Sequence, residues 1–403
     1  MVEDAFEFRT HCRLAEFLGG NLNFTQPLPL SLYVHYPWCI EKCPYCDFNS
    51  HTLKQEIDEA QYVQSLLRQL EQTLPMIWGR PIRSIFFGGG TPSLFSEAGI
   101  NEFMSQARAL LGFSPQIEIT LEANPGTVDY RKFAMFRQAG INRLSMGIQS
   151  FADDKLKALG RIHSSQEAKK AIQAAKDAGF DNFNLDLMFA LPQQSLQQAI
   201  EDVRQALDFE PPHLSHYQLT LEPNTPFYKQ PPPLPDDDLA WEMQQACQEV
   251  IAEAGYQHYE VSAYAKPGHQ CQHNLNYWRF GDYIGLGAGA HGKITMAPEG
   301  RVLRTQMPAS PGGYVETMKQ PNPGRTTEVD EGELLFEFML NALRLQEGFD
   351  LSLFSQHTGL ELSVLQPHLQ TMQQHDWAQI QDNKLILTKS GKTYLNNVVS
   401  LFL

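Results

Sequence analysis

The sequence lacks the features that mark membrane-spanning, secreted or nucleic-acid-binding proteins. No apolar run approaches the length of a membrane span, and the acidic start, residues 1–9, lacks the apolar core of a secretion signal. The 31 Lys and Arg are outnumbered by 46 Asp and Glu, and a net charge of −15 disfavours nucleic-acid binding because phosphates attract cations. Six cysteines in 403 residues are too few for a disulfide framework. We therefore expect a folded cytoplasmic protein with no nucleic-acid partner.

Three of those cysteines, Cys39, Cys43 and Cys46, form the pattern Cys-x3-Cys-x2-Cys directly after an apolar run at 32–36. Three thiolates on one short loop can ligate three irons of a 4Fe-4S cubane and leave the fourth iron without a protein ligand. An iron with an open position can bind a small molecule and pass it one electron. The spacing is that of radical S-adenosylmethionine (SAM) proteins, which it resembles closely.

Two other interpretations of the triplet stay open at this point. A zinc site needs four ligands, and His35 or His51 could supply the fourth. A disulfide requires an oxidising compartment, which nothing in the sequence indicates. The scattered Cys12, Cys247 and Cys271 are interpreted as small hydrophobic residues or free thiols.

Short apolar runs alternate with amphipathic stretches through the first half of the chain. The apolar runs lie at 32–36, 82–87, 117–122, 143–148, 183–189 and 213–221. The amphipathic stretches lie near 58–77, 96–111, 128–139, 165–178 and 196–208. This alternation predicts an α/β fold whose parallel sheet has right-handed crossovers. Six units predict a partial (β/α)6 barrel rather than a closed eight-stranded one.

The remaining pattern predicts four regions. They are a lead-in at 1–30, the partial barrel at 31–230, a connecting region at 231–325 and a C-terminal domain at 326–403. Several Pro and Gly predict that 296–325 is loop-like. The C-terminal region predicts three helices, then strands at 379–387 and a last helix, an order that resembles a winged-helix, α+β domain. Because this region has few Lys or Arg, we expect packing or partner binding there rather than DNA binding.

The loops that follow the predicted strands carry candidate SAM ligands, since α/β sheets of this kind bind ligands at the carboxyl ends of their strands. The second strand is followed by Gly88-Gly89-Gly90-Thr91-Pro92-Ser93, where glycines allow close backbone approach. This loop could hold the amino and carboxylate groups of SAM. Glu122 ends the third strand and could pair with the SAM ammonium.

Three further polar residues come from the next two units. Gln149 can both donate and accept hydrogen bonds, Arg161 can bind a carboxylate with two nitrogens, and Asp186 can accept hydrogen bonds from ribose hydroxyls. Tyr33 lies on the first strand, where it is either an adenine or cluster neighbour or simply a core aromatic. Each of these residues alone could equally be a turn residue or part of a surface ion pair. Their shared position at one rim of the sheet favours a site.

These motifs together resemble the radical SAM family of oxygen-independent coproporphyrinogen III oxidase and its relatives. The matching segments, which cover nearly the whole chain from about residue 31, begin at Tyr33, Phe87, Glu122, Arg143 and Asp186. The resemblance implies ligation of a 4Fe-4S cluster by the three loop cysteines. It also implies SAM contacts from Tyr33, Gly89, Gly90, Thr91, Glu122, Gln149, Arg161 and Asp186.

Within that family the chain resembles the heme chaperone branch, HemW, more than the oxidase. The oxidase has a further Cys two residues past the third cluster ligand, where this chain has Phe48. Residues 273–278 match the His-Asn-x-x-Tyr-Trp signature of the chaperone branch. The resemblance implies a protein that binds heme and delivers it to acceptor proteins, respiratory cytochromes among the candidates. The long lead-in and Ala263, where the family usually has Asn, depart from the pattern.

Two questions stay open in the sequence. The first is function, since a radical enzyme that acts on a porphyrinogen is the alternative to a heme chaperone; we assign no catalytic residue. The second is the heme ligand. His273 is the candidate within the signature, while the other interpretation is local hydrogen bonding, with Tyr277 and Trp278 sealing the join between barrel and tail. Further candidates are His35, His216 and His291. Peripheral contact with a membrane also stays open.

Overall fold

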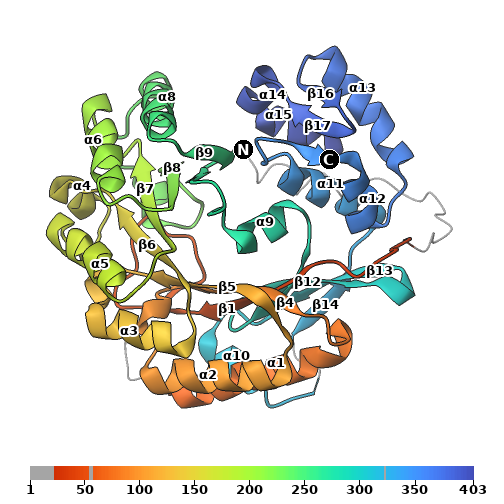
Figure 1. Cartoon of the computed structure of the whole chain (residues 1–403), viewed down its shortest axis with the longest axis horizontal. Helices are drawn as coiled ribbons and strands as arrows, with labels where there is room; N and C mark the ends of the chain where they lie inside the picture. Colours follow the sequence, from red (N-terminus) through yellow and green to blue (C-terminus); the bar gives the residue numbers. More distant parts are fainter. Residues whose placement is uncertain (1–21, 54–57, 322–323) are drawn as a thin grey trace.

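Figure 1 shows a curved sheet with helices packed on its outer side and a smaller domain, drawn in blue, beside it. This computed structural model describes residues 22–53, 58–321 and 324–403. Most of the predicted lead-in 1–30, together with Cys12, therefore lies outside the described residues.

Six parallel strands form the centre of the sheet and match the six predicted runs. They are β1 (Leu30–Tyr36), β4 (Ile82–Gly89), β5 (Phe113–Ala123), β6 (Arg143–Gln149), β7 (Phe183–Phe189) and β8 (His213–Gln218). Each strand pairs in parallel with the next, so the predicted α/β sheet is confirmed. The described sheet is open, with β14 (Arg325–Glu328) and β9 (Gln257–Glu260) at its two edges, as a partial barrel requires.

Helices connect these strands on the outer side of the sheet (Figure 1). They are α1 (Glu59–Ile77), α2 (Glu97–Leu110), α3 (Tyr130–Ala139), α4 (Asp153–Ala158), α5 (Ser165–Asp177) and α6 (Leu196–Leu207). Capping boxes begin two of them, because Ser164 and Ser195 exchange hydrogen bonds with Glu167 and Gln198 three residues later. These crossovers bring the carboxyl ends of all six strands to one rim, where a ligand site is expected.

Further strands extend the sheet beyond β1. The strand β11 (Asp282–Leu286) pairs in parallel with β1, and the antiparallel strands β12 (His291–Met296), β13 (Arg301–Gln306) and β14 follow. The expectation that 296–325 is loop-like is therefore wrong in part, because this segment contains β13 and also the helix α10, Pro311–Thr317. The Pro and Gly of this segment lie mostly at element ends. Pro311, for example, begins α10, where a missing N–H costs nothing.

Beyond β8, two short strands complete the sheet, and the chain then returns to its hollow as the helix with the His-Asn-x-x-Tyr-Trp signature. After α8 (Asp237–Glu253), the short strand β10 (Ala263–Ala265) pairs antiparallel with β8, and β9 pairs antiparallel with β10. The chain then enters α9, Gln272–Trp278, which lies in the hollow of the curved sheet and packs against β1 and β4 (Figure 1). The division of the chain at 231–325 stays a prediction, but this segment contributes strands to the same sheet as the barrel.

The C-terminal domain has the three predicted helices followed by the predicted strands, with an additional short strand after the first helix and two short helices in place of one at the end. These are α11 (Glu331–Ala342), β15 (Phe349–Asp350), α12 (Leu351–Thr358), α13 (Gln366–Gln374), β16 (Ala378–Gln381), β17 (Lys384–Leu387), α14 (Lys389–Thr393) and α15 (Leu395–Val399). The hairpin β16–β17 pairs with β15, which is the arrangement of a winged helix. Its own apolar core includes Phe280 and Val302 from the barrel side, so the domain is packed against the barrel. Nowhere in the described ranges is there a helix both long and apolar enough to cross a bilayer.

Candidate cluster and cofactor site

The three loop cysteines lie on a short, closed turn at the carboxyl end of β1. Its start and end are joined by a parallel pairing of β2 (Trp38–Cys39) with β3 (His51–Thr52). Within the turn the Cys46 N–H donates to the Cys43 carbonyl oxygen at 3.1 Å. The Lys42 ammonium donates to the carbonyl oxygens of Phe48 and Ser50 at 2.9 and 3.3 Å. These bonds hold the three thiols at one rim of the barrel.

Cys39 is buried, and Cys43 and Cys46 are half-buried. Burial raises the pKa of Cys39 and of Cys46, which favours neutral thiols as long as no metal is bound. The Arg161 guanidinium reaches the loop, with Nη1 3.7 Å from Cys43 Sγ. A bound metal ion would deprotonate such thiols outright, and a nearby guanidinium stabilises the resulting negative charge.

Neither histidine that could be a fourth zinc ligand belongs to a metal-binding group among the described residues. His35 is held by two contacts, since Nδ1 lies 3.0 Å from the Tyr33 hydroxyl and Nε2 lies 2.8 Å from the Asn49 carbonyl oxygen. His51 Nε2 lies 3.3 Å from the carbonyl oxygen of Ala309. Over residues 22–53, 58–321 and 324–403, no three His, Cys, Asp or Glu side chains gather as ligands of one ion. A cubane fits the donors better, because its three thiolates bind three separate irons.

The predicted glycine loop lies against the cysteine loop. The N–H groups of Gly90 and Thr91 donate to the carbonyl oxygens of Tyr36 and Trp38 at 2.7 and 2.8 Å. A Cβ atom at Gly90 would come within 2.5 Å of the Trp38 oxygen. Gly89 has φ of +116°, and a Cβ there would meet the ring of His35 at 2.6 Å. Glycine is therefore required at both positions for the two loops to meet.

Glu122 ends β5 beside this loop, as the sequence predicted. Its Oε2 accepts the N–H of Gly89 at 3.2 Å. Burial, with the nearby negative charge of Asp186, raises the pKa of Glu122 to about 8. A buried carboxyl group of this kind lacks a cation, and an ammonium group bound next to it would restore the carboxylate.

Asp186 is held on β7 by neighbours that the sequence analysis did not single out. Its carboxylate accepts from Asn184 Nδ2 at 2.7 Å and from Ser145 Oγ at 3.2 Å. The Asn184 oxygen in turn accepts from Ser215 Oγ at 3.0 Å and lies 2.6 Å from His213 Nδ1. Polar residues at every second position of β6, β7 and β8 face the hollow. That two-residue period was the signal that could have identified them.

Gln149 and Arg161 lie at the same rim, and both show signs of a built site. Gln149 has φ of +68°, an uncommon conformation for a residue with a side chain, and Tyr217 donates to its Oε1 at 2.8 Å. Arg161 Nη2 donates to the Gly147 carbonyl oxygen at 2.8 Å. The Nε of Arg161 is buried without a hydrogen-bond partner among the described residues. A carboxylate in the adjoining cavity would satisfy this group.

A cavity of about 800 Å³ in the hollow of the barrel brings most of the predicted residues together. The predicted residues that line it are Cys39, Cys43, Cys46, Gly89, Gly90, Thr91, Glu122, Gln149, Arg161 and Asp186. Tyr33 lines a neighbouring cavity instead, together with Gly89 and Glu122. His273 lines neither of these two cavities.

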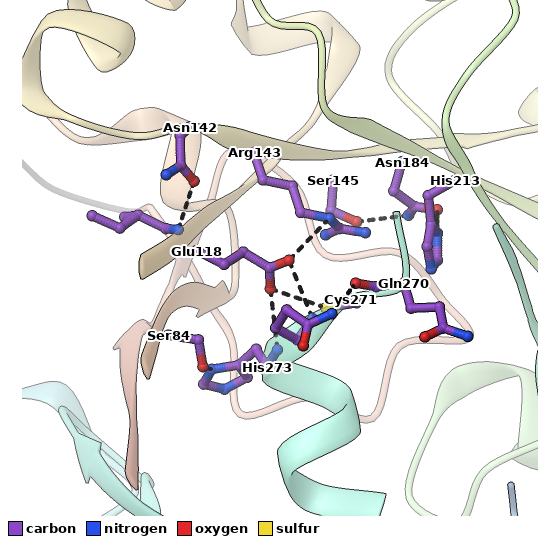
Figure 2. A network of polar contacts seen from close by, with 12 residues as sticks. Ser84, Glu118, Asn142, Arg143, Ser145, Asn184, His213, Gln270, Cys271 and His273 are labelled. Carbon is purple, nitrogen blue, oxygen red and sulfur yellow. Dashed lines mark hydrogen bonds and ion pairs between the residues drawn. The ribbon is translucent and has the colours of Figure 1, made fainter. Parts of the chain in front are cut away.

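His273 is enclosed by the polar network of Figure 2. The side chain is 1% exposed. Its Nδ1 lies 2.9 Å from Ser84 Oγ, and its Nε2 lies 2.9 Å from the Tyr277 hydroxyl. Burial lowers the pKa of His273 to about 3, so the ring is neutral. Binding of iron by His273 would require breaking one of these two contacts and opening the packing around α9.

Glu118, which the sequence analysis also missed, anchors the start of α9 (Figure 2). Its carboxylate accepts the backbone N–H groups of Gln272 and His273 at 3.2 and 3.1 Å, and the Cys271 thiol lies 3.6 Å from Oε1. Arg143 Nε lies 4.0 Å from Oε2. A carboxylate at a helix start satisfies N–H groups that the helix leaves free. No local signal could have paired residues this distant in sequence.

At the end of α9, Trp278 joins the barrel to the C-terminal domain. The Arg344 guanidinium lies over its indole ring, 4.3 Å from the ring centre, and Arg344 Nη2 pairs with Glu260 Oε2 at 3.0 Å. Trp278 also lines both cavities. The sealing role foreseen for this residue agrees with these contacts.

Comparison with known families matches both parts of the chain. Residues 33–206 match the Radical SAM superfamily, and residues 329–393 match the HemN C-terminal domain. The first match contains the cysteine loop and most of the strands that line the large cavity, except β8, and the second lies within the winged-helix-like domain. The solved structure of coproporphyrinogen III oxidase (HemN) from Escherichia coli has a TM-score of 0.78 at 22% identity, covering 93% of this chain and 90% of that one. This likeness supports the fold.

Two curated relatives are far more similar in sequence, and both are named heme chaperone HemW. The protein of Escherichia coli (strain K12) is 49% identical over 379 residues, which cover 93% of this chain and 98% of that protein. The protein of Haemophilus influenzae (strain ATCC 51907 / DSM 11121 / KW20 / Rd) is 47% identical over the same shares. The chain therefore belongs to the heme chaperone HemW family of the radical SAM superfamily.

Proposed function

We propose that this protein binds heme and delivers it to acceptor proteins, and that it carries a 4Fe-4S cluster with SAM on the open iron. The observation that carries the proposal is 49% identity to a heme chaperone HemW over 93% of the chain, with three thiols at the rim of the barrel cavity. The Phe48 side chain stands where the related oxidase has a further Cys.

For the cluster, we assign Cys39, Cys43 and Cys46 as ligands. The donor set fits, because three thiols from one loop leave one iron for a non-protein ligand. When bound, such a cluster supplies one-electron chemistry to SAM. Gly160, with φ of +67°, packs closely against Pro44 of the cysteine loop, and a Cβ at this position would lie 2.7 Å from Pro44 Cδ.

For SAM, we assign the polar groups on the cavity wall. Glu122 would bind the ammonium group, and the unpaired Nε of Arg161 would bind the carboxylate. Asp186, oriented by Asn184 and Ser145, would accept from the ribose hydroxyls. The other SAM neighbours in the proposal are Tyr33, Gly89, Gly90, Thr91 and Gln149.

The identity of the heme ligand remains part of the proposal. His273 was the candidate from the sequence, but both of its ring nitrogens already have partners within 2.9 Å. These contacts favour the alternative, in which His273 positions α9. For cellular context we propose the cytoplasm, with heme-acceptor proteins as partners and respiratory cytochromes among the candidates.

The proposal is tested by reconstituting the full chain anaerobically with iron and sulfide. Iron and sulfide analysis should give four of each per chain. Titration with ferric and ferrous heme, with and without SAM, should give saturable binding near one heme per chain. The loaded protein should then transfer heme to an apo-cytochrome. Failure to bind heme under reducing, anaerobic conditions would overturn the proposal.

The alternative from the sequence, a radical enzyme acting on a porphyrinogen, is tested in the same preparation. Coproporphyrinogen III, SAM and an electron donor are incubated anaerobically, and decarboxylated product is measured by chromatography. We expect no product at a useful rate. Product formation at a rate comparable to an oxidase would overturn the chaperone assignment, even if heme also bound.

A further inference from the structure

A second cavity, of about 690 Å³, lies beside the cluster loop and is separate from most of the proposed SAM contacts. It lies between the end of that loop, the helix α9 and the strands β11 and β12. Its aromatic walls are formed by Tyr33, Phe48, Tyr277, Trp278, Phe280 and Tyr283. Pockets of this volume enclose flat ligands of drug size or larger, and rings of this kind pack against aromatic faces.

Two imidazoles line this cavity, His35 and His291, and only one is free to bind a metal. His35 has a contact at each ring nitrogen. His291, the first residue of β12, has an exposed side chain, and within the described ranges its ring makes no hydrogen bond. Partial burial and the nearby Arg304 lower the pKa of His291, so the imidazole is neutral at pH 7, the form that ligates metals.

The floor of the cavity is built in part from the glycine-containing segment 281–292. The Asn49 amide, just past the cluster loop, donates to the carbonyl oxygens of Ala288 and Ala309, both at 2.9 Å. Gly289 has φ of +72°, and a Cβ there would meet Asn49 Nδ2 at 2.3 Å. The glycine therefore lets the cluster loop and the segment that carries His291 lie against each other.

Both basic side chains that line the cavity are already paired, which leaves the aromatic rings and the imidazole of His291 as the recognition elements for an apolar ligand. Lys293 pairs with Asp282 at 2.9 Å, and Arg304 donates to the Tyr283 hydroxyl at 2.6 Å and pairs with Glu337. One buried side-chain donor of the cavity wall has no partner among the described residues. The indole N–H of Trp278 has no acceptor among the described residues, so turning it toward a ligand carboxylate would lose no hydrogen bond.

Phe48 adds an aromatic ring to this cavity at the position where the oxidase pattern has Cys. Its side chain is 58% exposed although it is large and apolar, and it lines both cavities at the edge of the cluster loop. A flat, apolar macrocycle would cover it.

We propose that a metalloporphyrin binds in this second cavity, with His291 as an axial ligand of its iron and Phe48 and Trp278 against its faces. The inference rests on the proposed function, since heme is taken as the ligand. It replaces His273, the heme ligand expected from the sequence, with His291. His273 would instead orient Tyr277, which forms one wall of the cavity.

The test compares the full-length, anaerobically reconstituted chain with His291→Ala and with His375→Ala, which removes an exposed imidazole of the C-terminal domain. Heme is titrated, and the axial ligand is identified from absorption and electron paramagnetic resonance spectra. Loss of a residue that only orients a metal ligand already costs about ten- to a hundredfold in metal affinity. Because His291 is proposed as the ligand itself, His291→Ala should weaken heme binding at least about tenfold. The variant should also lose the spectroscopic features of axial histidine ligation (the histidine signature), and added imidazole should restore them. His375→Ala should behave as the unaltered chain.

The variant His273→Ala separates this inference from the alternative ligand. We expect it to keep the histidine signature, with lower thermal stability. A His291→Ala protein with unchanged heme affinity and spectrum would overturn the inference while leaving the proposed function in place. Loss of the histidine signature in His273→Ala, with His291→Ala unaffected, would also overturn it. Absence of heme binding by the unaltered chain would overturn the proposed function and this inference together.

Discussion

The carboxylate of Glu122 lies 3.2 Å from the backbone nitrogen of Gly89, on the neighbouring strand. Through this contact the buried acid meets the glycine loop, and the glycine loop in turn lies against the cysteine loop. An acid, a set of main-chain groups and three thiols thus meet at one rim. The raised pKa of Glu122 indicates that the carboxylate lacks a cation there.

Glu122→Gln should weaken SAM binding, because the amide is similar in shape but offers no charge to the SAM ammonium. Removing one partner of a buried charge pair costs several kcal/mol, so we expect a loss of at least about tenfold in affinity. Binding is measured by calorimetry on the cluster-loaded chain, and iron content should be unchanged. Glu102→Gln, at an exposed position of α2, is the matched control and should leave SAM affinity unaltered. Equal loss in both variants would contradict the assignment.

The pH dependence of SAM binding should follow the same carboxyl group. Its pKa of about 8 means that the free protein carries a proton on Glu122 at pH 7, whereas the SAM ammonium favours the carboxylate. Binding must then release a proton, so affinity should rise with pH, by up to about tenfold per unit between about pH 6.5 and 8. Proton release is measured by calorimetry in buffers of different ionisation enthalpy. In Glu122→Gln this slope should disappear, and a slope of opposite sign in the unaltered chain would refute the role.

Cys43→Ser should prevent assembly of the cluster, because a serine hydroxyl is a poor ligand for iron compared with a thiolate. Iron and sulfide content and the absorption of the reconstituted protein are the measurements. Cys247→Ser provides the control, since Cys247 is buried in α8 within the barrel core, away from the loop. That variant should keep its iron even if it is less stable. Unchanged iron in Cys43→Ser would show that the loop does not ligate the cluster as assigned.

The sheet could be predicted from the sequence because its strands are marked by short-range residue patterns. Runs such as 183–189 are buried on both faces and alternate with capped helices, so strand order and direction follow from short-range patterns and from right-handed crossovers. Two of the rim residues followed from the same logic, since Glu122 and Gln149 lie at the carboxyl ends of β5 and β6, whereas Asp186 lies in the middle of β7.

The position of α9 could not be predicted in this way. The helix has seven residues, too few to form alone, and it lies in the hollow because Glu118 binds its first N–H groups from more than 150 residues away. The same long-range contacts determine that His273 is enclosed while His291 lines a cavity. The sequence offered both histidines as candidates, and only the packing of the chain distinguishes them.

The dependence of α9 on Glu118 gives a last prediction, for Glu118→Ala. The variant leaves the N–H groups of Gln272 and His273 without their acceptor and removes the carboxylate that pairs with Arg143, which is 2% exposed. Breaking a buried ion pair in this way costs about 3–5 kcal/mol, which should appear as a lower midpoint of urea unfolding. Glu242→Ala, at an exposed position of α8, should change the midpoint little.

Because α9 carries Tyr277 and Trp278, heme binding should weaken in Glu118→Ala under conditions where the chain is still folded, while SAM binding should be less affected. Equal weakening of both ligands would indicate general unfolding rather than displacement of α9.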